Sequence, residues 1–332
     1  CSYLQQKFPK TKFDFINAGI PSMGSIPGAF RFKRDVLARG LVDLLFEEAA
    51  VNDAINKKAP DLISFAMEGI VYHAKKANPL CDIVMMHFVD PKKMSDYREG
   101  KQPMVIKLHE KVAEHYNIST INLAKEVTDR IDAGEFDWEN DFKNLHPSPF
   151  GQKIYAQSIK TFLESELEYS FTNNKTETNT PPQPLNEASF LNGVLVKPNL
   201  SHQREGWTIV KNWKPKQKAG TRNNYVDVPM LVGQYPGDKI KFKFEGNAVG
   251  ISVAAGPNAG IIEYKIDNSG WKQKDLFTAY SEKLYLPRYY VLASGLKNKK
   301  HTLKIRVIND GNSMDDGNTC VIRYFFINTS SN

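Results

Sequence analysis

Short apolar segments alternate with amphipathic ones through the first half of the chain. Short strands are predicted within FDFIN (13–17), LVDLLFEEAAV (41–51), DIVMMHFV (82–89) and STINL (119–123). Between and after them, apolar residues recur at helical spacing over 60–77, 104–116 and 149–167. Ser148 is placed to cap the last helix, and Pro149 stands at its first position. Strands that alternate with helices predict an α/β domain whose parallel sheet is covered on both faces.

The second half has a different period. Residues 238–246 and 301–307 alternate polar and apolar side chains, as a strand with one buried face does. Residues 261–266 and 321–327 read as further strands, and DNSG at 267–270 is a turn signal. Many short strands with Gly, Pro and Asn turns predict an all-β sandwich of the jelly-roll kind.

A Thr-, Asn- and Pro-rich segment at 172–184 separates the two patterns and is typical of a linker. The 332 residues are enough for two domains. We therefore expect an α/β domain over 1–170, a linker over 171–185 and a β-sandwich domain over 186–332.

Charge divides at the same place. Residues 1–185 carry 23 Lys+Arg and 25 Asp+Glu (−2), and residues 186–332 carry 21 and 12 (+9). The excess of positive charge on residues 186–332 either attracts an acidic glycan or belongs to a solvated sheet whose lysines protect its edges. Its lysines alternate along strands without a recognition helix, which argues against nucleic acid as a partner. No apolar run reaches the roughly 18 residues of a membrane span, and three cysteines are too few for a disulfide framework.

Candidate chemistry lies in the loops that leave the strands, because ligands of open parallel sheets bind at the carboxyl ends of the strands. The loop at 17–25 is rich in small residues, so its backbone N–H groups, including that of Ser22, can approach a ligand. Asn52 offers a side-chain N–H, and His146 precedes the last helix. Together they supply two oxyanion donors and a general base, the parts of an acyl-transfer site without its nucleophile.

Each candidate has a structural alternative. Asn52 and Asp53 are also good caps for the following helix, and His146 is also compatible with a packed loop. His87 and Asp90 form a second possible His–acid pair, although His87 is expected to be buried in the sheet. His109 is expected to be solvated on its helix.

With these residues in place, the first half resembles the SGNH (GDSL-type) hydrolases over about residues 1–168. The resemblance rests on three segments in order: Asn17-Ala-Gly-Ile-Pro-Ser-Met-Gly24, Ala50-Val-Asn52-Asp53 and Asn144-Leu-His146-Pro147. It implies a three-layer, flavodoxin-like hydrolase domain in which His146 is the base. The Ser22 backbone N–H and the Asn52 side chain would bind the oxyanion.

The chain departs from the family pattern in two places. The family's nucleophilic serine sits in a Gly-Asp-Ser segment after a strand upstream of the Asn17 loop, and this sequence has no such segment. The resemblance therefore implies a strand and a serine upstream of Cys1. The family's triad acid is expected at position 143, where this chain has Lys143. Asp141, a backbone carbonyl or an acid from elsewhere in the chain is left to orient His146.

The second half resembles the β-domain attached to some bacterial carbohydrate esterases. The resemblance therefore implies an esterase that removes O-acetyl groups from a polysaccharide, acts in the periplasm or outside the cell, and needs no metal or organic cofactor. Either a sugar-stacking platform or core packing explains its aromatic residues, which include Trp207, Trp213, Trp271, Tyr285, Tyr289 and Tyr290.

Two other functions remain open. Ile20-Pro-Ser22-Met-Gly24 partly matches a nucleophile elbow, so Ser22 itself is a second candidate nucleophile. A degenerate hydrolase that only binds glycan, or serves a structural role, would also lack the serine and the acid.

Overall fold

The computed structural model describes residues 1–173, 181–200, 203–308 and 318–330. Contacts divide the chain into two compact units. Unit 1 comprises Cys1–Gly19 and Asp35–Leu185, and unit 2 comprises Ile20–Arg34 and Asn186–Asn332. Residues 20–34 therefore group with the C-terminal part of the chain, whereas the sequence pattern places them in the first domain. Seven residues of the predicted linker, 174–180, lie outside the described residues, so the expected domain boundaries stay a prediction.

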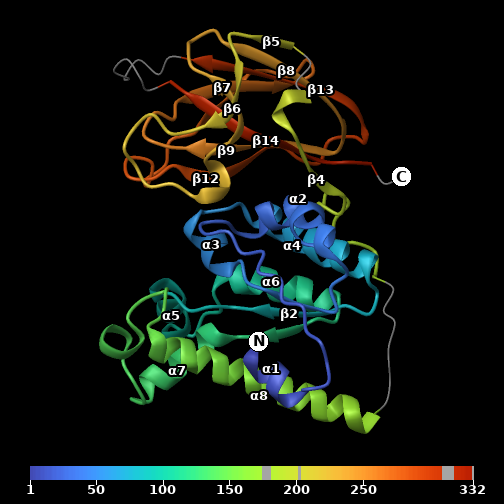
Figure 1. Cartoon of the computed structure of the whole chain (residues 1–332), viewed down its shortest axis with the longest axis vertical. Helices are drawn as coiled ribbons and strands as arrows, with labels where there is room; N and C mark the ends of the chain where they lie inside the picture. Colours follow the sequence, from blue (N-terminus) through green and yellow to red (C-terminus); the bar gives the residue numbers. More distant parts are fainter. Residues whose placement is uncertain (174–180, 201–202, 309–317, 331–332) are drawn as a thin grey trace. The chain divides into compact units, whose positions relative to one another are not determined.

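Unit 1 is built on a three-stranded parallel sheet in the order β1-β2-β3, with β1 (Leu44–Glu47), β2 (Asp82–Met86) and β3 (Ser119–Ile121). Figure 1 shows α4 and α6 on one side of β2 and α7 and α8 on the other. This arrangement confirms the predicted α/β fold. The central strand follows from its apolar run, because a strand covered by helices on both faces must be apolar throughout.

The predicted strand at 13–17 is wrong, because these residues form neither helix nor strand. A strand exists only where a neighbour pairs with its backbone, and no described strand pairs with this segment. Phe15 and Ile16 are 46% and 37% exposed, so the apolar run that suggested a strand does not enter the core.

The helices of unit 1 follow the predicted apolar spacing closely where that spacing extends over several turns. Those predicted at 60–77, 104–116 and 149–167 are confirmed as α4, α6 and α8, although α8 continues into the predicted linker. The helical elements of the unit are α1 (Ser2–Lys7), η1 (Leu37–Arg39), α3 (Ala50–Ile55), α4 (Pro60–Ala77), α5 (Pro91–Arg98), α6 (Met104–His115), α7 (Leu123–Asp132), the π-helix η2 (Trp138–Phe142) and α8 (Pro149–Asn173). None of the described helices is both long and apolar enough to cross a bilayer.

Unit 2 contains two antiparallel sheets, as the sequence predicts for a β-sandwich. One has the order β11-β10-β13-β8-β5, and the other has the order β12-β9-β14-β7-β6 with β4 paired to β14. Their bounds are β4 (Gly193–Val196), β5 (Gln203–Glu205), β6 (Thr208–Trp213), β7 (Val228–Gly233), β8 (Lys239–Gly246), β9 (Ala248–Ala255), β10 (Ile261–Ile266), β11 (Lys272–Asp275), β12 (Leu286–Ala293), β13 (Lys299–Ile308) and β14 (Cys320–Asn328). Unit 2 also contains two short 3₁₀ helices, η3 (Pro198–Leu200) and η4 (Asn223–Tyr225).

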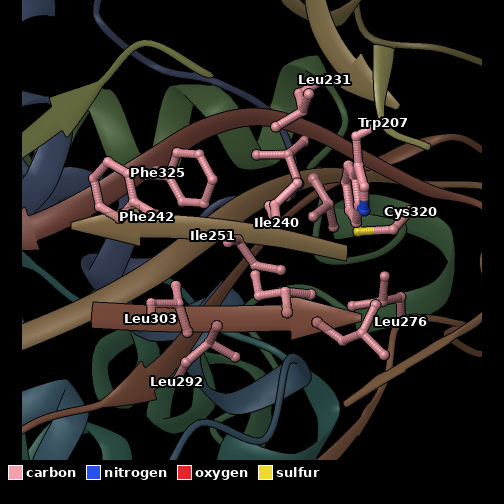
Figure 2. Packing of buried hydrophobic residues seen from close by; sticks show 14 of the residues in the cluster. Trp207, Leu231, Ile240, Phe242, Ile251, Leu276, Leu292, Leu303, Cys320 and Phe325 are labelled. Atoms are coloured by element: carbon pink, nitrogen blue, oxygen red, sulfur yellow. The ribbon is translucent and has the colours of Figure 1, made fainter. Parts of the chain in front are cut away.

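The core of unit 2 lies between the two sheets (Figure 2). Burial alternates along β8, which leaves its lysines exposed and directs Ile240, Phe242 and Phe244 inward. The ring of Phe242 stacks on Phe325 of β14, in the opposite sheet, with centroids 4.1 Å apart. Alternation in the sequence therefore identified the inward face correctly.

A helix that the sequence pattern did not reveal also belongs to unit 2. Helix α2 (Ser25–Asp35) buries Phe30, whose ring lies 4.8 Å from that of Phe190 and 4.4 Å from that of Phe326. Pro27 and Gly28 argue against a helix when the sequence is read alone. A proline in the first turn nevertheless costs no hydrogen bond, because the N–H groups there have no partner within the helix. These aromatic contacts explain why residues 20–34 group with the sandwich.

Candidate functional site

The carboxyl edge of the unit 1 sheet carries most of the predicted chemistry. Strand β1 leads into α3, which bears Asn52, and β2 leads into the loop before α5. Strands β1 and β2 are parallel, with Glu47 opposite Met85, so both leave the sheet at this edge. Asn52 therefore lies where parallel-sheet proteins bind their ligands.

Asn52 does not cap a helix, contrary to the structural alternative for this residue. Helix α3 begins at Ala50 with Ala49 as its N-cap, so Asn52 stands within the first turn. Its side chain is partly buried, and no described residue hydrogen-bonds its amide. An amide group in this position remains available to a ligand.

The residue after Asn52 anchors the same helix to α6. The Asp53 carboxylate lies 3.2 Å from Nε2 of His109, and both side chains are fully buried. The expectation that His109 is solvated is therefore wrong. It faces inward because it lies on the buried face of α6, the helix that packs against both α3 and α4. The pair restrains α3, and with it the orientation of Asn52.

Glu47 and Glu48, at the end of β1, both have a raised carboxyl pKa. Burial, with the neighbouring charges of Glu48 and Asp53, raises the pKa of Glu47 well above its ordinary value. Burial also raises the pKa of Glu48, whose carboxylate accepts a hydrogen bond from the Val51 backbone N–H at 3.0 Å. The Glu48 contact satisfies a free N–H in the first turn of α3.

His87 and Asp90 do not form the His–acid pair considered as an alternative. Asp90 caps α5, accepting from the backbone N–H of Lys93 at 3.0 Å, and forms a buried ion pair with the same lysine's ammonium group. His87 is fully buried, as expected, and its nearest carboxylate is that of Glu110 at 3.7 Å. Burial, together with His109 and Lys93, lowers the pKa of His87 to about 3, so this imidazole is neutral at pH 7.

His146 lies on an exposed loop between η2 and α8. Its backbone N–H donates to Oδ1 of Asn144 at 2.7 Å, and no described residue hydrogen-bonds its ring. The Asp141 carboxylate accepts from the Asp137 backbone N–H at 2.9 Å instead, so the structure does not show the Asp141–His146 contact considered from the sequence. The imidazole is accessible to a substrate.

The start of α8 holds the His146 loop in place. The Ser148 hydroxyl accepts from the Gly151 backbone N–H at 3.3 Å, which confirms Ser148 as a cap. A Cβ atom on Gly151 would come within 2.7 Å of Pro147 and 2.8 Å of the Phe142 ring. Farther along α8, the Tyr155 hydroxyl accepts from the Val89 N–H at 3.0 Å. Since Val89 follows β2, the helix that carries the His146 loop is tied to the same edge of the sheet as Asn52.

Replacing Gly151 with alanine is expected to lower the stability of unit 1 by about 1–3 kcal/mol, the usual cost of overpacking. The loss should appear although alanine is the better helix former by up to about 1 kcal/mol. A thermal unfolding curve measures it. Gly270→Ala is the matched control, because a Cβ atom there meets nothing within 4 Å. Equal melting temperatures for the two variants would contradict the close packing at Gly151.

Ser22 belongs to unit 2, whereas Asn52 and His146 belong to unit 1. It has a positive φ of 70°, and its hydroxyl accepts from the Arg222 guanidinium at 3.3 Å. The structure thus places Asn52 at the carboxyl edge of the sheet, ties the helix that follows His146 to this edge through Tyr155, and groups Ser22 with the other unit. The buried groups Glu47, Asp53, Lys93 and His109 were missed as a cluster. Their sequence signal is weak, since a polar residue after a strand is ordinary.

Most of the aromatic residues considered for a sugar platform are core residues. Trp207, Trp213, Tyr285 and Tyr289 are buried. Trp271 is 38% exposed, and the Arg306 guanidinium lies 4.3 Å from its ring centroid. No group of three or more His, Cys, Asp or Glu side chains in the described part of the chain could hold a metal ion.

Comparisons with known proteins agree with this architecture. A scan against protein-family models found no match, and neither did a search of the curated proteins. Among solved structures, the chain is similar to a two-domain esterase active on acetylated mannans. The TM-score is 0.75 at 18% identity, over 99% of this chain and 84% of that chain. A structure of such an esterase co-crystallized with mannopentaose gives a TM-score of 0.74 at 18% identity over the same shares. At this identity the likeness shows the fold, an α/β domain joined to a β-sandwich.

Proposed function

We propose that this protein is a carbohydrate esterase that removes acetyl groups from a polysaccharide, with acetylated mannan as the first substrate to test. The observation that carries the proposal is the likeness over 99% of the chain to a two-domain esterase active on acetylated mannans. Asn52 at the carboxyl edge of the sheet and the exposed side chain of His146 support it. Such a polymer is met outside the cytoplasm, which makes a periplasmic or secreted location part of the proposal.

The proposed residues have distinct roles in ester cleavage. A serine hydroxyl attacks the acetyl carbonyl, and His146 accepts its proton and returns it to the departing sugar oxygen. The Asn52 amide donates to the oxyanion of the tetrahedral intermediate, and the Ser22 backbone N–H is the second proposed donor. Water then attacks the acetyl-enzyme, His146 accepts the proton of that water, and acetate leaves with the serine restored.

Acetate release tests the proposal. Protein expressed from the complete gene is expected to release acetate from acetylated mannan and to hydrolyse 4-nitrophenyl acetate. Absence of both activities would overturn it and favour the alternative, a degenerate hydrolase-like protein that binds glycan or has a structural role. A Ser22→Ala variant separates the two nucleophile assignments. It should keep its activity if only the Ser22 backbone is used, and lose it if the Ser22 hydroxyl attacks.

A further inference from the structure

A pocket of about 280 Å³ lies within unit 2, near the lower end of the volumes typical of ligand sites. Loop residues before α2, the end of α2, the turn η4, and strands β7, β12 and β14 all contribute to it. Its lining consists of Ile20, Met23, Arg34, Asn224, Tyr225, Val228, Tyr289, Arg323 and Tyr324. None of these described lining residues carries a carboxylate.

Two arginines of the pocket lining, Arg34 and Arg323, both contact the ring of Tyr324. The guanidinium carbon of Arg34 lies 4.6 Å from the ring centroid of Tyr324, and that of Arg323 lies 4.4 Å from it. These contacts have the geometry of cation–π interactions, which orient a guanidinium group over the face of an aromatic ring. Tyr324 thus positions two guanidinium groups at the same pocket.

The charge of Arg323 is costly in this place. Its pKa is lowered mainly by burial, and the nearby positive charge of Arg34 acts in the same direction. The guanidinium donates to the Pro229 backbone carbonyl at 3.0 Å, a neutral acceptor. The groups that would raise its pKa are the phenols of Tyr324, Tyr225 and Tyr289, and they would do so only as phenolate anions. An anionic ligand would therefore relieve a repulsion that is already built into the pocket.

The neighbouring phenols do not supply a negative charge. Burial raises the pKa of Tyr225 well above its ordinary value and also raises the pKa of Tyr289, so both hydroxyls are protonated at pH 7. The Tyr225 hydroxyl is paired with the Ser252 hydroxyl at 2.5 Å.

The rest of the lining suits a sugar ring. Ile20, Met23 and Val228 offer an apolar wall to ring C–H groups, and the exposed Asn224 offers an amide that can bind a hydroxyl. A planar guanidinium fork matches a planar carboxylate through two parallel hydrogen bonds. We propose that this pocket binds a carboxylate-bearing sugar residue of an acidic saccharide, with Arg323 and Arg34 on the carboxylate and Asn224 on a hydroxyl. The inference concerns binding alone and does not depend on the proposed hydrolysis.

Calorimetric titration of the whole chain tests this site with three probes: methyl β-D-glucuronide, methyl β-D-glucoside and inorganic phosphate. The glucuronide is expected to bind roughly 10-fold or more tightly than the glucoside, because a charge-assisted pair is stronger than a neutral one. Its affinity should fall as NaCl is added. Equal affinities for the two sugars would overturn the proposal. Phosphate binding as tight as that of the glucuronide would also overturn it, since the site would then recognise charge without a sugar.

Two variants locate the binding. Arg323→Gln should reduce glucuronide affinity to the level of the glucoside, whereas Arg204→Gln, on the exposed strand β5, should leave it unchanged. Because Arg323 also contacts Pro229, Asn224→Ala serves as a second variant at an exposed position. It should weaken both sugars and leave phosphate binding unaltered. Unchanged glucuronide affinity in both pocket variants would overturn the proposal.

Discussion

Replacing His146 with alanine is expected to lower kcat/KM for acetate release at least about 100-fold, the usual contribution of a general base. The proposed role is proton transfer from the nucleophile, and alanine cannot accept a proton. His146 is well suited to it because its ring is exposed and no described residue hydrogen-bonds it, while the loop is fixed by α8. The measurement is acetate release from acetylated mannan as a function of substrate concentration, in protein from the complete gene.

His115→Ala is the matched control for this experiment. His115 lies at the end of α6, where its ring contacts the Gln183 backbone carbonyl at 2.7 Å, and it has no role in the proposed site. The control should retain nearly full activity, and both variants should melt at the temperature of the parent. A His146→Ala protein that is folded and within a few-fold of the parent's kcat/KM would refute the base assignment.

Replacing Lys93 with methionine is expected to destabilise unit 1 by about 3–5 kcal/mol, the cost of leaving a buried charge without its partner. The Lys93 side chain is 2% exposed and pairs with the buried carboxylate of Asp90. Its positive charge also favours the ionised form of Glu48. Methionine fits the space but leaves Asp90 and Glu48 without that cation. For a unit of this size the melting temperature should fall by roughly 10 °C.

The adjacent lysine provides the control. Lys92 forms an ion pair with Asp96 on the surface of the same helix, but its side chain is 77% exposed. Exposed pairs contribute about 0–1 kcal/mol, so Lys92→Met should melt within a few degrees of the parent. If the two variants melted at the same temperature, the buried pair would contribute no more than a surface pair does.

The sequence was most informative where a pattern repeats over several residues. The apolar spacing of 60–77 predicted α4 to the residue, and the alternation of 238–246 identified both β8 and its inward face. It failed at 13–17, where an apolar run of similar composition forms no strand. Both segments have suitable side chains, but a strand also needs a partner for its backbone groups, and a single segment carries no information about its partner.

For the candidate site, the sequence supplied the residues and the structure supplied their surroundings. Asn52 was identifiable because it stands in the first turn after a strand, and His146 because it stands in a loop just before a helix. Both positions are defined by local pattern. Burial could not be read in the same way. His109 carries polar neighbours in the chain and still lies fully buried beside Asp53, which is 56 residues away.

The sequence by itself determined the α/β and β-sandwich classes, the order of most elements and two members of the candidate site, because local periodicity and turn chemistry encode these features. Only the tertiary structure decided that residues 20–34 group with the sandwich, that Lys93 and His109 are buried, and that Arg34 and Arg323 meet at Tyr324. Those outcomes depend on contacts between residues that are distant in the chain. Such contacts leave no periodic signature in one sequence, since any polar residue suits several surroundings until its partners are in place.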